Sequence, residues 1–277
     1  MERKKVYITV KTYPTLSEKY DELVCTAGVC EDGSWIRLYP LPFRKLDNDQ
    51  KFKKWQWIEV DIERNTSDFR PESFKVLNTD NLTVIPGISE KVNWNERKRI
   101  IFKTEKAFTN KAEIIRLTKT NPPSRTLLIF KPAQIIKFYA KPTEREWPQN
   151  KLDLIKEKAK QFSLFQTQEE LLEEFKVVDK LPYEFRYIFT DDEGVESDLM
   201  IEDWEIGTLY LNCLKNANGD EEVAIEKVSQ KYWDEFVKKR DIHFFLGTRL
   251  RDQLRSPNPF SIVGVIPFPV DKQNELF

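Results

Sequence analysis

Residues 22–40 read ELVCTAGVCEDGSWIRLYP, and this stretch decides the predicted fold of the first half of the chain. The run from Glu22 to Cys30 is rich in strand-forming residues, Asp32-Gly33 is typical of a tight two-residue turn, and Ser34 to Pro40 resumes a strand. The pattern predicts a β-hairpin.

A turn centred on Asp32-Gly33 fixes the pairing across this hairpin: Cys30 with Trp35, Val29 with Ile36, Gly28 with Arg37, and Ala27 with Leu38. Trp35, Arg37 and Tyr39 would then share the face that carries Thr26 and Gly28, opposite an aliphatic face. If this face is open, the rings of Trp35 and Tyr39 would stack on a nucleobase, and the Arg37 guanidinium would make a bidentate hydrogen bond to a phosphate. If a helix or a second barrel covers it, the rings are core and Arg37 snorkels or pairs with an acid.

Two strings in the hairpin, Cys25-Thr-Ala-Gly28 and Gly33-Ser-Trp-Ile-Arg-Leu38, resemble the opening hairpin of dual OB-containing domains of bacterial conflict systems. The resemblance implies an OB-like β-barrel that binds nucleic acid. It also implies a place in a prokaryotic defence or mobile-element system.

The composition bounds the class of protein. The chain has 277 residues, 40% of them hydrophobic, which suits one large or two ordinary domains. Neither an apolar run of membrane-spanning length nor an apolar signal segment is present, so we expect a cytoplasmic protein with no membrane partner. With 3 Cys and 1 His, and without a phosphate loop, nucleophile elbow or dinucleotide fingerprint, we predict no metal and no cofactor.

Charge is distributed unevenly along the chain. Residues 91–160 carry 18 Lys and Arg against 7 Asp and Glu, a difference of +11, whereas residues 166–235 carry 6 against 20, a difference of −14. We expect the basic part to meet nucleic acid and the acidic part to offer a surface to a protein partner. A charge run of this kind is also typical of a solvated face.

These patterns predict an α+β protein. An N-terminal β-barrel-like (OB-like) domain with a basic helix, residues 1–148, precedes a smaller acidic α/β domain, residues 149–277. Residues 94–119 lack Pro and Gly and predict one basic helix capped by Asn93, while strands at 126–130 and 134–140 are expected to complete the first sheet. The predicted nucleic-acid-binding residues are Trp35, Arg37, Tyr39, Arg44, Arg97, Arg99 and Lys103.

The second half predicts a hairpin over 183–201, helices over 151–165, around 168–174, and over 203–216 and 221–240, then apolar strands at 242–246 and 260–266. The strings Phe185-Arg-Tyr187, Asp203-Trp-Glu205, Phe245-Leu-Gly-Thr248 and Val263-Gly-Val-Ile266 resemble an uncharacterised prokaryotic protein family. Its members carry Cys and His before the Asp-Trp-Glu string, which implies a metal site, but residues 190–198 of this chain contain neither.

The sequence leaves three functions open. The first is nucleic-acid binding, with DNA and RNA not distinguished. The second is a metal-dependent nuclease, in which Mg²⁺ would be held near Arg249 and Arg251 by a set of C-terminal carboxylates: Asp191, Asp192, Asp198, Glu202, Asp203 and Glu205. The third is a protein adaptor without nucleic acid. His243, in an apolar strand, is predicted to be packed and hydrogen-bonded rather than catalytic.

Overall fold

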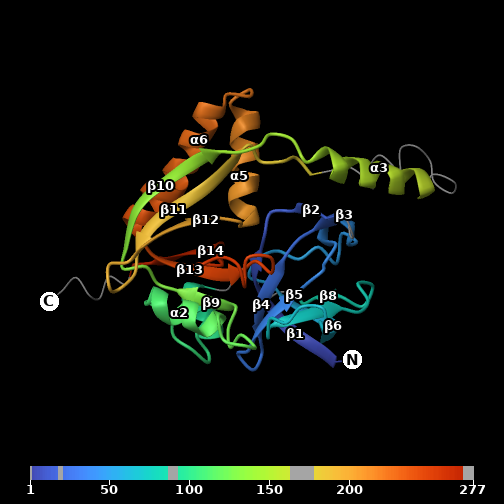
Figure 1. Ribbon diagram of the computed structural model, residues 1–277, viewed down its shortest axis with the longest axis horizontal. Coiled ribbons are helices and arrows are strands. Elements are labelled where there is room, and N and C mark those ends of the chain that lie inside the picture. The colour runs from blue at the N-terminus through green and yellow to red at the C-terminus, as the bar shows by residue number, and fades with distance from the viewer. Residues whose placement is uncertain (1, 18–20, 87–92, 163–177, 271–277) are drawn as a thin grey trace.

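The chain folds as an α+β protein, seen here in a computed structural model that describes residues 2–17, 21–86, 93–162 and 178–270 (Figure 1). The helix predicted around residues 168–174 lies outside these ranges. None of the described helices is long and apolar enough to cross a bilayer.

The N-terminal part is a closed five-stranded β-barrel of OB-like topology. β6 pairs back onto β1 and closes the ring, and β5 and β7 run parallel while the other neighbours are antiparallel. β2 (Thr15–Ser17) and β3 (Asp21–Leu23) form a small hairpin between the first two barrel strands, and β8 (Thr83–Val84) extends along β6. The barrel strands in pairing order are β1 (Glu2–Lys11), β4 (Thr26–Cys30), β5 (Trp35–Leu38), β7 (Ser73–Val76) and β6 (Trp57–Arg64).

The β4–β5 hairpin is confirmed, but its predicted register is wrong by one residue. Val29 pairs with Trp35 and Ala27 with Arg37. The connection is a three-residue loop, because the Cys30 amide donates to the Ser34 carbonyl (2.9 Å) and leaves residues 31–33 between them. The Gly33 amide donates to the Cys30 carbonyl (2.9 Å), and Gly33 has a left-handed φ of 90°. Trp35 and Arg37 therefore share their face with Val29 and Ala27, and not with Gly28.

No open space lies over Gly28. A Cβ added to Gly28 would lie 2.2 Å from the backbone oxygen of Tyr7 and 2.8 Å from Cγ1 of Val6. The glycine is needed because β1 passes this close to β4, so it serves strand packing rather than a ligand.

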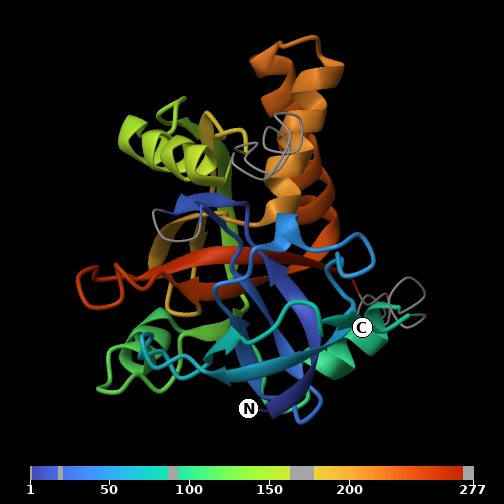
Figure 2. The ribbon, with the colours of Figure 1, turned by 90° about the vertical axis from the view of Figure 1, so that its right-hand side faces the viewer.

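A three-stranded central sheet lies on the barrel (Figures 1 and 2). Its order is β14 (Phe260–Pro269), β13 (Arg240–Thr248) and β9 (Leu127–Phe130). Successive residues alternate between two buried faces: Phe245 and Ile129 pack toward the barrel, while Phe244 and Phe130 pack the other way. Burial on both faces explains why these strands read as continuous apolar runs in the sequence.

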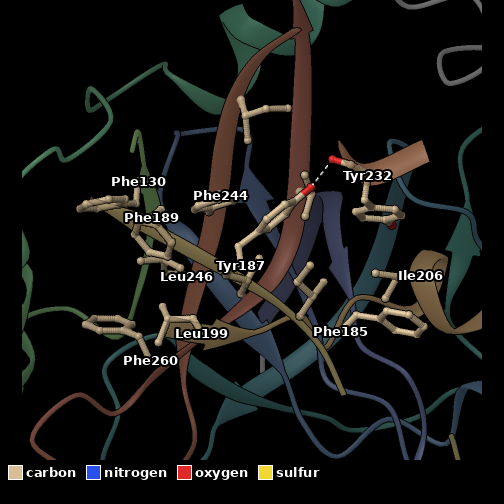
Figure 3. Packing of buried hydrophobic residues seen from close by; sticks show 14 of the residues in the cluster. Phe130, Phe185, Tyr187, Phe189, Leu199, Ile206, Tyr232, Phe244, Leu246 and Phe260 are labelled. Carbon is tan, nitrogen blue, oxygen red and sulfur yellow. Dashed lines mark hydrogen bonds between the residues drawn. The ribbon is translucent and has the colours of Figure 1, made fainter. Parts of the chain in front are cut away.

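A second sheet packs against three helical segments. β10 (Gln134–Pro142), β11 (Tyr183–Thr190) and β12 (Glu196–Met200) lie beneath α5 (Trp204–Asn216), α6 (Glu221–Ser229) and the π-helical segment η2 (Gln230–Val237). Aromatic residues fill the space between them, and the hydroxyl of Tyr187 donates to the Tyr232 carbonyl at 2.6 Å (Figure 3). α3 (Gln149–Phe162) projects to one side (Figure 1).

Two predictions about the middle of the chain are wrong. β9 pairs with β13 and β10 pairs with β11, so neither completes the barrel sheet. The single basic helix is two short helices, α1 (Trp94–Ile101) and α2 (Lys111–Thr118), because the segment between them runs along β9: the Phe108 amide donates to the Ile129 carbonyl, and the Lys131 amide donates to that of Phe108, each at 2.8 Å. The predicted Asn93 cap is confirmed, since its side chain accepts from the Glu96 amide.

Candidate functional sites

Trp35 is core, in agreement with the covered-face interpretation of the hairpin. Only 6% of the residue is exposed, because the central sheet lies over it. The Trp35 ring meets Phe245 edge-on at 5.5 Å between centroids, and its indole Nε1 donates to Glu105 at 2.7 Å. Glu105 also pairs with Arg125 at 3.0 Å. No part of the ring is presented for stacking a base.

Arg37 belongs to a buried polar cluster that joins the barrel to the central sheet. It is 1% exposed, and its guanidinium donates to the Thr126 hydroxyl at 3.2 Å and to the Ser73 hydroxyl at 3.4 Å. The Glu72 carboxylate accepts from the amide (2.8 Å) and hydroxyl (2.6 Å) of Thr126. Burial lowers the pKa of Arg37. The guanidinium N–H groups predicted to bind a phosphate instead donate to groups within the protein.

The five other predicted binding residues occupy different surroundings. Tyr39, Arg44 and Arg97 are half-buried, whereas Arg99 and Lys103 are exposed. The Arg97 guanidinium carbon lies 4.8 Å from the ring centroid of Trp55 and 4.7 Å from that of Trp94, a double cation–π contact. Of the seven predicted binding residues, Arg99 and Lys103 are exposed to solvent, and they lie four residues apart in the chain.

Cations continue beyond these two residues and form what we call the basic surface, in which Lys98 is half-buried and the other members are exposed: Lys98, Arg99, Lys103, Lys106 and Lys131. Arg99 pairs with Glu96 of its own helix (3.3 Å) and Lys131 with Asp241 (3.1 Å), while Lys103 donates to the Glu31 carbonyl.

Two members of the basic surface, Lys98 and Lys131, lie near His243. This residue packs against the rings of Phe102 and Phe268, as predicted, but its Nδ1 has no hydrogen-bond partner among the described residues. Burial lowers the pKa of His243, and the nearby charges of Lys131 and Lys98 lower it further against the opposing effect of Asp241. Cations from α1 and from the end of β9 therefore lie on the same side of the central sheet.

The C-terminal carboxylates do not assemble into a metal site in the part of the chain that the structure describes. All six accept from protein donors, at several different places in the fold. Asp191 accepts from the Lys111 amide, Asp198 from Arg186, and Glu202 from Ser261, while Asp203 and Glu205 share a lysine. The predicted nuclease arrangement therefore has no geometric support.

A cleft of about 570 Å³ lies between the barrel and α5. The buried ammonium of Lys54 contacts Asp203 at 2.7 Å and Glu205 at 3.0 Å. Burial opposes the charge of Lys54, but the two carboxylates outweigh it and raise its pKa. Asp203 also caps α5 by accepting from the Glu205 amide (3.2 Å). The Asp-Trp-Glu string noted in the sequence thus anchors α5 to the barrel.

Lys11, at the end of β1, lines the same cleft and was not anticipated from the sequence. Its ammonium lies 3.9 Å from the ring centroid of Phe43 and 4.6 Å from that of Trp204. Burial lowers the pKa of Lys11 to about 8, against the attraction of Glu205 and Asp203 and with a further lowering by Lys54. A perturbed lysine in a cleft marks a candidate binding position. No motif in the sequence around Lys11 signals it.

Two family models cover the chain. Domain of unknown function (DUF8758) matches residues 2–103, and Domain of unknown function (DUF8757) matches residues 107–277. The chain belongs to the DUF8757 family. The DUF8758 match spans the barrel and α1, and the DUF8757 match begins just before Phe108, where the chain reaches the edge of β9.

No curated protein matches this DUF8757 chain. Among solved structures, one of a murine DNA-binding protein bound to double-stranded DNA aligns with a TM-score of 0.30 and 10% identity, covering 98% of this chain and 99% of that chain. At this TM-score the similarity carries no argument about either fold or function.

Proposed function

We propose that the protein binds nucleic acid through the phosphate backbone, and that the contact surface is the basic surface rather than the outward face of β4 and β5. The observation that carries the proposal is the exposure of Arg99, Lys103 and Lys106 on one stretch of chain, where Glu96 is the one carboxylate that pairs with them among the described residues. Residues 94–131 as a whole carry 10 Lys and Arg against 3 Asp and Glu.

The chemistry of this surface favours binding without a sequence preference. Lysine and arginine side chains that displace condensed counterions supply most of the affinity in nonspecific complexes. The aromatic residue predicted to stack a base, Trp35, is enclosed, and Arg97 covers Trp55 and Trp94. We therefore expect contacts to phosphates, with a strong dependence on salt. The OB-like topology supports the proposal by analogy only.

The test is the affinity of a fluorescent oligonucleotide, single-stranded or duplex, measured by anisotropy across a salt series. Reversal of Arg99, Lys103 and Lys106 to Glu is expected to weaken binding at low salt by at least about tenfold. It should also reduce the slope of log K against log salt by about one for each phosphate that the variant no longer neutralises.

The matched control reverses the exposed cations Lys215, Lys227 and Lys238, which lie in the acidic half, and so imposes the same change in net charge. The proposal expects this control to retain most of the affinity. Equal loss of affinity in both triple variants would mean that only net charge matters, and no binding by the wild-type chain at low salt would favour a protein adaptor.

The wider biological setting rests on sequence alone. A cytoplasmic location, a protein partner for the acidic half, and a place in a prokaryotic defence or mobile-element system stay predictions.

A further inference from the structure

His243, the single histidine of the chain, lies on β13 beside two lysines of the basic surface. Its ring packs edge-on against Phe102 at the end of α1 and against Phe268 of β14, with centroids 5.9 Å and 5.0 Å away. The side chain is 9% exposed, and its buried Nδ1 has no hydrogen-bond partner among the described residues. A buried polar atom without a partner costs free energy, so a state in which Nδ1 gains one would be favoured.

One carboxylate faces both this imidazole and a lysine of the basic surface. Asp241 lies two residues before His243 on β13, so the two side chains point to the same face of the strand. Oδ1 of Asp241 is 3.1 Å from the Lys131 ammonium, and the same oxygen is 3.9 Å from Nδ1 of His243. The shorter distance allows a charge-assisted hydrogen bond, whereas the longer one is beyond hydrogen-bond range. Lys131 therefore holds the carboxylate that would otherwise serve the imidazole.

We propose that nucleic-acid binding at the basic surface is coupled to protonation of His243 through Asp241. The inference rests on the proposed function and adds control by pH to it. A phosphate that contacts Lys131 would replace Asp241 as the partner of the lysine ammonium. After a movement of about 1 Å, the released carboxylate would accept a hydrogen bond from the Nδ1–H of the His243 imidazolium. The proton comes from solvent, so binding of the phosphate and uptake of a proton accompany each other.

The surroundings of the imidazole favour its neutral form in the free protein. Burial lowers the pKa of His243 below its ordinary value, and Asp241 opposes this effect. Lys131, directly after β9, and Lys98, on α1, lower the pKa further, while β14 contributes the uncharged ring of Phe268. A bound phosphate offsets the positive potential of the two lysines and should raise the pKa of His243. Affinity should therefore increase as the pH falls through the pKa of the bound state, and level off below that of the free state.

Nuclear magnetic resonance tests the coupling on the wild-type chain, because a single imidazole gives one set of histidine resonances. The pKa of His243 is titrated from about pH 5 to about pH 8, with and without a saturating oligonucleotide. We expect the pKa to rise by about 1 on saturation, which corresponds to about tenfold tighter binding at the acidic end. An unchanged pKa with the oligonucleotide bound would overturn the coupling and leave the proposed function standing. No binding at either end of the pH range would overturn both.

Variants assign the effect to His243 and Asp241. His243→Gln does not titrate in this range, so it should bind as wild type at about pH 8 and lack the roughly tenfold gain at about pH 5. Asp241→Asn removes the carboxylate at similar size and should lose most of the rise in the pKa of His243.

The matched control is Asp234→Asn, which removes a carboxylate paired with Lys238 in the acidic half and imposes the same change in net charge. It should keep the full rise. A full rise in Asp241→Asn would refute the exchange of partners, and an equal acid gain in His243→Gln and wild type would refute the role of the imidazole.

Discussion

Trp35 gives the sharpest test of whether the outward face of the hairpin is core or a binding surface. The structure makes two separable contributions there: an edge-on ring contact with Phe245 and a hydrogen bond from the indole to Glu105. Trp35→Phe removes the hydrogen bond and part of the ring, while Trp35→Ala removes both contributions. The two variants therefore divide the stabilisation that the face provides.

The expected magnitudes follow from these contacts. A hydrogen bond to a charged group contributes about 1.5–3 kcal/mol, and Glu105 keeps Arg125 as a partner when the indole is removed, so Trp35→Phe should cost about 2 kcal/mol. Truncation of a fully packed tryptophan to alanine usually costs about 3–5 kcal/mol, and we expect Trp35→Ala to lie within this range because the residue is 6% exposed.

The assay combines urea unfolding, followed by circular dichroism, with oligonucleotide anisotropy at a known folded fraction. The free energy of unfolding should fall in the order wild type, Phe, Ala, and the affinity per folded molecule should not change. If Trp35→Ala unfolds at the wild-type midpoint but loses affinity, the ring faces a ligand and the covered-face interpretation is wrong.

Two other predictions concern the contact between the barrel and α5. Gly207→Ala should destabilise the fold by about 1–3 kcal/mol despite the better helix propensity of alanine, because the added Cβ would lie 2.3 Å from Cδ2 of Tyr13 and 3.0 Å from Cδ1 of Leu181; an unchanged urea midpoint would show that α5 is not held at this distance. Lys11→Met should stabilise the protein at pH 7 by about 1–2 kcal/mol, since burial of the lysine charge costs free energy that the two cation–π contacts only partly offset. The folded pKa of Lys11, about 8, lies below the ordinary value of 10.5, so the burial cost is complete below pH 8 and disappears as the pH rises through this window. The stability difference between variant and wild type should therefore shrink between pH 8 and 10.5, and a difference independent of pH would contradict the assigned pKa.

Local patterns were sufficient for most elements of the fold. The α5 helix, predicted over 203–216, forms over Trp204–Asn216, and the hairpin predicted at 183–201 forms. The β4–β5 strands were also correctly placed, but Asp32-Gly33 is compatible with both a two-residue and a three-residue turn, and the difference of one residue changed which side chains share a face.

Long-range contacts account for the errors that remain. Nothing in the sequence between Trp94 and Lys119 breaks a helix, and the break arises because the Phe108 backbone pairs with the edge of β9. The cleft was missed for the same reason, since Lys11, Lys54 and Asp203 are far apart in the chain and meet only when α5 packs on the barrel. We also predicted that β9 continues the barrel, because it follows the barrel strands in the sequence. It pairs instead with β13 in the central sheet, where both of its faces are buried.

Hydrogen exchange with and without a short oligonucleotide tests the central claim most directly, because it reports both the covered face and the contact surface in one experiment. The account predicts slow exchange of the amides in residues 27–38 in the free protein, no change there on binding, and slower exchange in residues 99–106 when the oligonucleotide is present. Protection of residues 27–38 on binding, with residues 99–106 unchanged, would contradict it.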